Sequence, residues 1–182
     1  LATGLAVTRN TVFSMFLHAG WLHLISNMWF LWIFGDNIED RMGHLRFLFF
    51  YLLCGALASA THIAFHSEST VPAVGASGAV AGVLGAYLIC YPFARIQTIV
   101  PFILIWPVIQ IPAIVVLGSW FLVQVANGTA DLAGSSIESG GIAWWSHIGG
   151  FFAGVLGVLS ANMRSIRALS FCSQLVPHQS HD

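Results

Sequence analysis

Five apolar runs constrain the fold of this chain more than any other feature of its sequence. They cover residues 22–34, 47–65, 74–91, 99–125 and 141–161. Short polar or glycine-rich joints separate them at residues 35–46, 66–72, 92–98 and 127–140. A helix needs about 20 mostly apolar residues to cross the hydrocarbon core of a bilayer, and the runs are near that length. The sequence therefore predicts an all-α bundle whose five helices span a membrane.

The composition supports a polytopic membrane protein. Hydrophobic residues make up 57% of the chain, charged residues only 7%, and the mean hydropathy is +0.82, whereas soluble domains carry about 25% charged residues. The formal net charge of −1 offers nothing that would recruit nucleic acid or an acidic surface. We therefore expect the partners to be membrane lipids and other membrane proteins.

The joints and the arginines predict the domain organisation and the orientation. No joint is long enough for a second folded domain, so we expect one membrane domain at residues 1–163 and a polar cytoplasmic tail at 164–182. Positive residues concentrate on the cytoplasmic side of membrane proteins. Only Arg9 falls on one side of the predicted bundle, and the other five arginines fall on the opposite side or in the tail: Arg41, Arg46, Arg95, Arg164 and Arg167. We therefore expect a cytoplasmic C-terminus. As a separate expectation, we place the protein in a bacterial inner (plasma) membrane.

The motif Gly-Ala-Ser-Gly at residues 75–78 opens the third apolar run, which is unusually short. From Ser77 to Tyr91, just before the helix-breaking Pro92, a helix rises only about 21 Å, against a hydrocarbon core of about 30 Å. A helix that begins below the membrane surface is tolerated only where it lines a water-filled cavity or is buried in protein. We therefore expect Ser77 to lie at a sunken helix start.

Two interpretations of Ser77 are open. A helix start presents unpaired N–H groups and a partial positive charge to a developing oxyanion, which suits a nucleophilic serine with its own N–H donor. The alternative is helix packing, because Ser77, Ala81 and Gly85 form a stripe of small residues of the kind found at helix contacts in membranes.

His147 favours the first interpretation. Gly150 and Gly154 follow it at three and seven residues, so it lies on a stripe that can approach a neighbouring helix closely. In that geometry the imidazole takes the Ser77 hydroxyl proton as general base and returns it to the leaving amine. The alternative is a histidine that hydrogen-bonds across helices for packing alone. No acidic third member is evident, so the sequence predicts a Ser–His dyad whose histidine is oriented by packing and non-acidic hydrogen bonds.

His23 and Asn27 are four residues apart and would share one helix face. Both can donate hydrogen bonds, and with the Ser77 N–H they could form an oxyanion hole, in which one donor is typically worth about 3 kcal/mol. The alternative for Asn27 is an interhelical hydrogen bond worth about 1 kcal/mol. A metal site from His18 and His23 is disfavoured, because their spacing diverges on a helix and no Cys or carboxylate accompanies them.

These motifs, in this order and on separate apolar runs, resemble those of the rhomboid intramembrane serine proteases. Residues 35–43 also resemble the cytoplasmic turn of that family. The resemblance covers nearly the whole chain and rests on three motifs: His18-x4-His23-x3-Asn27, Gly75-x-Ser77-Gly78 and His147-x2-Gly150-x3-Gly154.

The resemblance implies a serine endopeptidase that cuts transmembrane helices of other membrane proteins near the outer face, without a metal or an organic cofactor. It implies Ser77 as nucleophile and His147 as base. It also implies His23, Asn27 and the Ser77 N–H as oxyanion stabilisers. Substrate helices would enter laterally between the spans. The family core has six spans, and by this resemblance the chain carries five of them and lacks the first.

Two positions depart from the family pattern around the histidine. Some bacterial members have a tyrosine one turn after the nucleophile, stacked on the histidine, where this chain has Ala81, and alanine commonly precedes the histidine where this chain has Ser146. We therefore expect Trp144 or Trp145 to support His147. Gln124 could touch a substrate, although loop polarity explains it equally well.

Two functions of other classes fit the composition. A non-catalytic rhomboid-like protein would bind membrane helices, but such relatives typically lack the serine or the histidine, and this chain keeps both. A transporter would more often place acidic residues within its spans, and the five apolar runs contain none.

Overall fold

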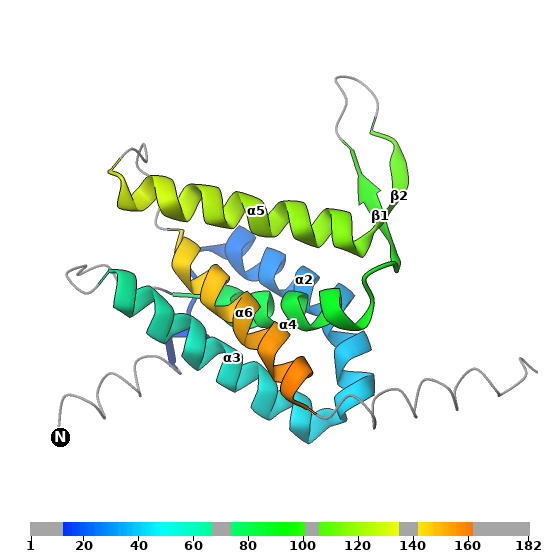
Figure 1. Cartoon of the computed structure of the whole chain (residues 1–182), viewed down its shortest axis with the longest axis horizontal. Coiled ribbons are helices and arrows are strands. Elements are labelled where there is room, and N and C mark those ends of the chain that lie inside the picture. Colours follow the sequence, from blue (N-terminus) through cyan, green and yellow to red (C-terminus); the bar gives the residue numbers. More distant parts are fainter. Residues whose placement is uncertain (1–12, 67–73, 101–105, 135–141, 162–182) are drawn as a thin grey trace, which may run out of the picture.

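The computed structural model describes residues 13–66, 74–100, 106–134 and 142–161. In this part of the chain, five helices and one two-stranded hairpin follow each other (Figure 1). The strands β1 (Arg95–Ile99) and β2 (Val108–Pro112) lie between α4 and α5. The helices are α2 (Trp21–Met42), α3 (His44–Phe65), α4 (Ser77–Cys90), α5 (Ala113–Leu132) and α6 (Trp144–Ser160). The predicted tail at 164–182 lies outside the described residues.

The helices α4 and α6 pack with their backbones in direct contact. A Cβ atom on Gly150 would collide with the carbonyl oxygen of Gly78, and one on Gly154 would collide with that of Gly82. An added methyl group would need space that the facing backbone already occupies. Because the two pairs occur in the same order along both helices, α4 and α6 run parallel.

The helix α3 lies against α6 in the opposite direction. Phe50 near the start of α3 contacts Gly157 near the end of α6, whereas Thr61 near the end of α3 contacts Gly149 near the start of α6. A Cβ atom on Gly149 would collide with the Thr61 side chain, so this contact also depends on a small residue. The helices α3, α4 and α6 therefore form one closely packed group.

The helix α5 packs on α6 through large side chains instead. Phe121 stacks on Phe151 with ring centroids 4.4 Å apart, and Leu117 is only 1% exposed. The indole N–H of Trp145, near the start of α6, donates to the carbonyl oxygen of Gly128, near the end of α5, at 3.2 Å. The two helices are therefore antiparallel, and side chains separate their backbones.

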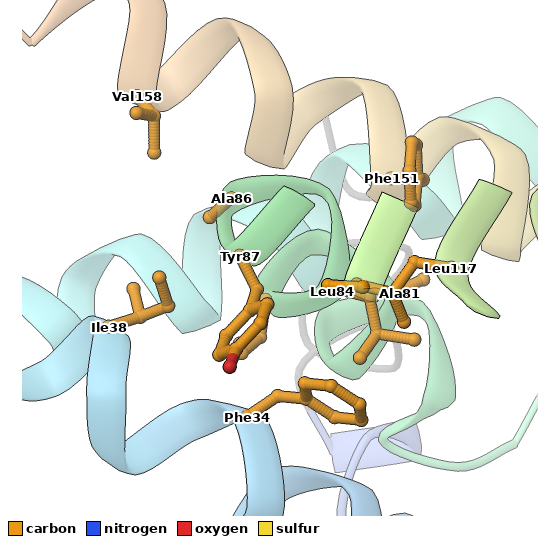
Figure 2. Packing of buried hydrophobic residues seen from close by; sticks show 11 residues of the cluster. Phe34, Ile38, Ala81, Leu84, Ala86, Tyr87, Leu117, Phe151 and Val158 are labelled. Atoms are coloured by element: carbon orange, nitrogen blue, oxygen red, sulfur yellow. The ribbon is translucent and has the colours of Figure 1, made fainter. Parts of the chain in front are cut away.

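The helix α4 lies in the middle of the bundle, with α6 in front of it in the view of Figure 1. Its residues 78–87 are all buried. The core around it includes Phe34 of α2, Leu117 of α5 and Phe151 of α6 (Figure 2). Tyr87 lies edge-on to Phe34, with ring centroids 5.0 Å apart. The neighbouring helices therefore shield most of α4 from the surroundings.

The fourth apolar run is not one helix, so the prediction of a single span at 99–125 is wrong. Its first part belongs to the antiparallel hairpin of β1 and β2, and α5 begins only at Ala113. Proline explains the difference, because it lacks a backbone N–H and its ring clashes with the preceding helical turn. The run contains three of them: Pro101, Pro107 and Pro112.

Two predicted joints are wrong in their bounds. Residues 35–46 do not form a polar connection, because α2 and α3 are separated only by Gly43, which has a φ of +81°. Polar residues continue a helix readily, whereas a glycine in the left-handed region ends it. At the other predicted joint, 127–140, the helix α5 continues to Leu132.

Polar side chains join the ends of α2 and α4. The Nε–H of Arg41 donates to the Tyr91 hydroxyl at 2.7 Å, and this hydroxyl donates to the carbonyl oxygen of Asn37 at 3.2 Å. Arg46, in the first turn of α3, and Arg95, at the start of β1, lie near the same end of the bundle. Their position at one end agrees with the sequence prediction that these three arginines lie on the same side of the bundle. The other three lie outside the described residues: Arg9, Arg164 and Arg167.

The outer surface of the bundle is apolar. Among the described helices, α3 and α5 are long and apolar enough to cross a membrane, with mean hydropathies of 1.7 and 1.5. Large side chains are exposed on the other helices as well, including Trp21 at 80% and Leu22 at 82% on α2. Soluble monomers rarely expose large continuous apolar patches. The surface therefore suits contact with lipid.

Candidate active site

One cavity of about 420 Å³ lies between α2, α4, α5 and α6. Four of its lining residues are those that the sequence singled out as a site: Ser77, His147, His23 and Asn27. The rest of the wall is largely apolar and includes Phe30 of α2, Leu84 of α4 and Trp120 of α5. The fold therefore brings residues from distant motifs to one cavity.

Ser77 is the first residue of α4, as predicted. The N–H of Val80 makes the first hydrogen bond of this helix, to the carbonyl oxygen of Ala76 at 2.9 Å. The N–H of Ser77 precedes that bond and lies in the first turn, where the backbone donors of a helix have no partner within it. The side chain of Ser77 and a backbone donor are therefore available at the same end of the helix.

Gly75 brings the backbone before α4 against α2. Its φ of +115° favours glycine, and a Cβ atom there would lie 2.6 Å from Cε1 and 2.9 Å from Nε2 of His23. The N–H of Gly75 donates to the carbonyl oxygen of Ser14 at 2.8 Å. Only a residue without a side chain allows the loop to approach His23 this closely.

His147 lies in the first turn of α6 and is held by α5. Its Nδ1 is 2.8 Å from the side-chain Oε1 of Gln124, which is only 4% exposed. The Trp120 ring lies 5.8 Å from the imidazole between centroids, and Trp144 meets it edge-on at 6.4 Å. This arrangement agrees with the expectation of a non-acidic hydrogen bond and of support from Trp144.

Trp145 does not give His147 the support that the sequence analysis considered for it. Its ring stacks on Phe65 of α3 with centroids 3.7 Å apart, and its N–H donates to the carbonyl oxygen of Gly128. It therefore joins α3, α5 and α6 at one end of the bundle, and no ring contact links it to His147 in the described residues.

Ser77 and His147 line the same cavity without a hydrogen bond between them in the described part of the chain. Such bonds are often long in a catalytic site without substrate and shorten when the substrate binds.

His23 and Asn27 lie one turn apart on α2 and both line the cavity. Asn27 is 5% exposed, and its Nδ2 is buried and has no hydrogen-bond partner among the described residues. A buried amide donor without a partner costs free energy, so a ligand that accepts a hydrogen bond here would remove that cost. His18 lies edge-on to His23, with ring centroids 5.2 Å apart.

Sequence reasoning missed the part of α5 in this site. Gln124 was assigned to substrate contact or loop polarity, and Trp120 was not considered. The signal was present, because Gln124 is an amide inside an apolar helix and follows Trp120 by one turn. Within the described ranges, no group of three His, Cys, Asp or Glu side chains could hold a metal ion.

The chain is similar to proteins of one family. The sequence profile of the Rhomboid domain matches residues 7–161. The chain is 33% identical over 149 residues to Rhomboid protein 1, mitochondrial, from Saccharomyces cerevisiae, a match that covers 79% of this chain and 39% of the yeast protein. It is 34% identical over 163 residues to Rhomboid-like protease 5 from Toxoplasma gondii, covering 86% of this chain and 16% of that protein.

A shorter match links the chain to a bacterial protein. It is 43% identical over 72 residues to Rhomboid protease GluP from Bacillus subtilis, which covers 40% of this chain and 14% of the relative. In all three cases the match spans less than half the length of the relative.

Proposed function

The chain belongs to the rhomboid family and is an integral membrane protein with a polytopic helical fold, and from this premise we propose that it is an intramembrane serine endopeptidase. One observation carries the proposal: Ser77, His147 and two side-chain donors of α2 line a single cavity at the start of a buried helix. We propose residues 1–163 as the membrane domain, with five spans, and residues 164–182 as a cytoplasmic tail.

The proposed reaction is acyl transfer to a serine and then to water. Ser77 Oγ attacks the carbonyl carbon of the scissile peptide bond while His147 accepts the hydroxyl proton. His147 then donates this proton to the leaving amine, and the C–N bond breaks. A water molecule, with His147 again as base, hydrolyses the acyl-enzyme and restores the serine.

The oxyanion of each tetrahedral intermediate needs fixed donors. We assign this role to the Ser77 N–H, to Asn27 and to His23. The support for Asn27 is its buried Nδ2 without a partner in the described residues. The support for His23 is its place in the cavity wall, against Gly75. Loss of one such donor typically lowers kcat by about 10²- to 10³-fold.

The proposed substrates are transmembrane helices of other membrane proteins. Two of the relatives are named as rhomboid proteases, and the apolar outer surface of the bundle suits partners that diffuse in lipid. We propose that a substrate helix enters laterally from the membrane, unwinds locally and reaches the cavity near the outer face.

We propose that the end of the bundle with Arg41, Arg46 and Arg95 faces the cytoplasm, because positive residues favour that side. The start of α4, with Ser77, then lies toward the outer face. The proposed membrane is the bacterial plasma membrane. The relatives reported above include one bacterial and one mitochondrial protein.

A serine-reactive fluorophosphonate tests the nucleophile directly. We expect the purified protein to be labelled and to cleave a model transmembrane substrate, and Ser77→Ala to lose both. Ser119→Ala is the matched control, because Ser119 is exposed on α5 and, among the described residues, its hydroxyl bonds only to the carbonyl oxygen of Val116. A Ser77→Ala protein that cleaves like the wild type would falsify the nucleophile assignment. A folded wild type that neither reacts nor cleaves would favour the non-catalytic, helix-binding alternative.

Asn27→Leu tests the oxyanion assignment. The branched side chain fills similar space but removes the amide donor, so we expect kcat to fall by about 10²- to 10³-fold. Fluorophosphonate labelling should slow as well, because the same donors stabilise the phosphonylation transition state. Unchanged kcat in a folded Asn27→Leu protein would show that Asn27 is not an oxyanion donor.

A further inference from the structure

Gln124 is a buried amide that uses both ends of its side chain. Its Nε2 donates to the carbonyl oxygen of Trp120 at 3.2 Å, and its Oε1 lies 2.8 Å from Nδ1 of His147. The side chain is only 4% exposed, so water cannot easily replace either partner. Gln124 is therefore the point at which α5 makes a polar contact with the imidazole on α6.

The two bonds of Gln124 determine which way its amide points. The Trp120 carbonyl oxygen can only accept a hydrogen bond, so the NH₂ group of Gln124 must face it. The opposite orientation would place two acceptor oxygens together and would leave the amide donor against the imidazole. The amide oxygen therefore faces His147.

The orientation of the amide in turn determines the position of the proton on His147. Because Oε1 accepts only, Nδ1 of His147 must carry the hydrogen. In a neutral imidazole the other nitrogen, Nε2, is then without a proton and can accept one. We propose that Gln124 is a positioning residue that holds His147 in the Nδ1–H tautomer and leaves Nε2 as the base for Ser77, an inference that rests on the proposed function.

Trp120 adds a second contact from the same helix. It precedes Gln124 by one turn, and its ring lies 5.8 Å from the imidazole between centroids, tilted by 37°. The imidazole is thus held at one nitrogen by the amide and on its side by the indole. By this proposal, α5 sets both the tautomer and the ring orientation of the base.

If Gln124 only stabilised the fold, its substitution would give a different result from the one expected if it positions His147. If its bonds only joined α5 to α6, their loss would lower the folding stability and leave the chemistry of the folded fraction unchanged. If it sets the tautomer of His147, its loss lowers kcat in fully folded protein and leaves KM nearly unchanged. The proton on the neutral His147 imidazole should also shift from Nδ1 toward Nε2.

The experiment compares Gln124→Met, Gln124→Glu and the control Gln110→Met. Methionine keeps the length of the side chain without a strong acceptor, and glutamate keeps an acceptor oxygen toward Nδ1. Gln110 is exposed on β2 and is not among the residues that line the cavity. We expect Gln124→Met to lower kcat by about 10- to 100-fold, by analogy with the loss of a group that orients a metal-binding histidine. Gln124→Glu should recover part of the loss, and Gln110→Met should match the wild type.

A spectroscopic readout separates this inference from the proposed function. Nitrogen-15 NMR of labelled histidine distinguishes Nδ1–H from Nε2–H imidazole, and His147→Ala identifies the signal. We expect the Nδ1–H form in wild type and in Ser77→Ala, and a shift toward Nε2–H in Gln124→Met. A Gln124→Met protein with wild-type kcat, or with an unchanged His147 signal, would overturn the inference and leave the protease assignment intact. An unreactive wild type would instead refute the proposed function.

Discussion

The helix α6 contacts α4 and α5 through different kinds of residue. Against α4 it presents glycines, and the two backbones touch. Against α5 it presents aromatic rings, as in the stack of Phe121 on Phe151. A backbone contact can change only if a whole helix moves, whereas a contact between large side chains can adjust by rotamer changes.

This difference separates two parts of the proposed site. Ser77 and His147 lie on the helices in backbone contact, so the distance between nucleophile and base depends on glycine packing. The groups that orient the base, Gln124 and Trp120, lie on α5, whose contacts are more adjustable. We infer that the contact of α4 with α6 tolerates substitution least, and the following changes test this in order of expected size.

Gly154→Ala should be the most damaging change for stability. Its methyl group would collide with the carbonyl oxygen of Gly82, and α4 cannot move away without losing its other contacts. We expect a loss of about 3 kcal/mol, the upper end of the usual cost of overpacking, measured as the free energy of unfolding in detergent. Gly118→Ala on α5 is the control, since none of the described atoms lies within 4 Å of its added Cβ. If both variants lost the same stability, the contact of α4 with α6 would not be less tolerant of an added methyl group than the site at Gly118.

Leu117→Ala tests the buried side of α5. Leu117 is 1% exposed, whereas Leu122 on the same helix is 68% exposed. We expect Leu117→Ala to lose about 2 kcal/mol, the lower end of the range for buried leucines, because the neighbouring side chains can move into the space. Leu122→Ala should unfold like the wild type. A loss from Leu117→Ala above that from Gly154→Ala would show that α5 is the more rigid partner.

Gly75→Ala extends the comparison to the loop before α4. The backbone strain of a non-glycine residue at positive φ costs about 1–2 kcal/mol, and the new methyl group would displace the His23 ring. We therefore expect a modest loss of stability with a larger loss of kcat, measured on the same preparation. Gly20→Ala is the control, because Gly20 has an extended φ of 178° and no described neighbour within 4 Å of its added Cβ. A Gly75→Ala variant with unchanged kcat would show that the conformation of this loop does not affect the reaction.

His66→Phe should have the smallest effect. The Nε2 of His66, after the end of α3, lies 2.9 Å from Oδ2 of Asp131 in the last turn of α5, and both side chains are about one-quarter exposed. Partly exposed pairs of this kind contribute at most about 1 kcal/mol. Thermal unfolding should therefore change little. A loss above that of Leu117→Ala would mean that α5 is held by its end and not by its apolar face.

The sequence predicted well those features that depend on local chemistry. The start of α4 at Ser77 followed from the glycines beside it, and its end near Tyr91 followed from the proline after that residue. The glycines that follow His147 predicted a close helix contact, which the structure has between α6 and α4. These residues have one dominant physical role, so a single sequence suffices to interpret them.

Other features depend on partners that are distant in the sequence. Hydropathy alone could not separate the hairpin of β1 and β2 from α5, because apolar residues suit a strand and a helix equally and only the prolines mark the boundary. The role of Gln124 depends on the position of α5 beside α6. No pattern within one helix shows which side chain will face an imidazole on another.

The burial of α4 has a consequence for the order of biosynthesis. This helix is only 14 residues long, and the ribosome delivers it before α6, which carries the proposed base and covers its glycine face. Until α6 inserts, Ser77 lacks both the proposed base and the wall of the cavity that α6 supplies. The proposed peptidase activity therefore begins only when the last of the described helices has docked, so a nascent chain cannot cut its neighbours in the membrane before its own assembly is complete.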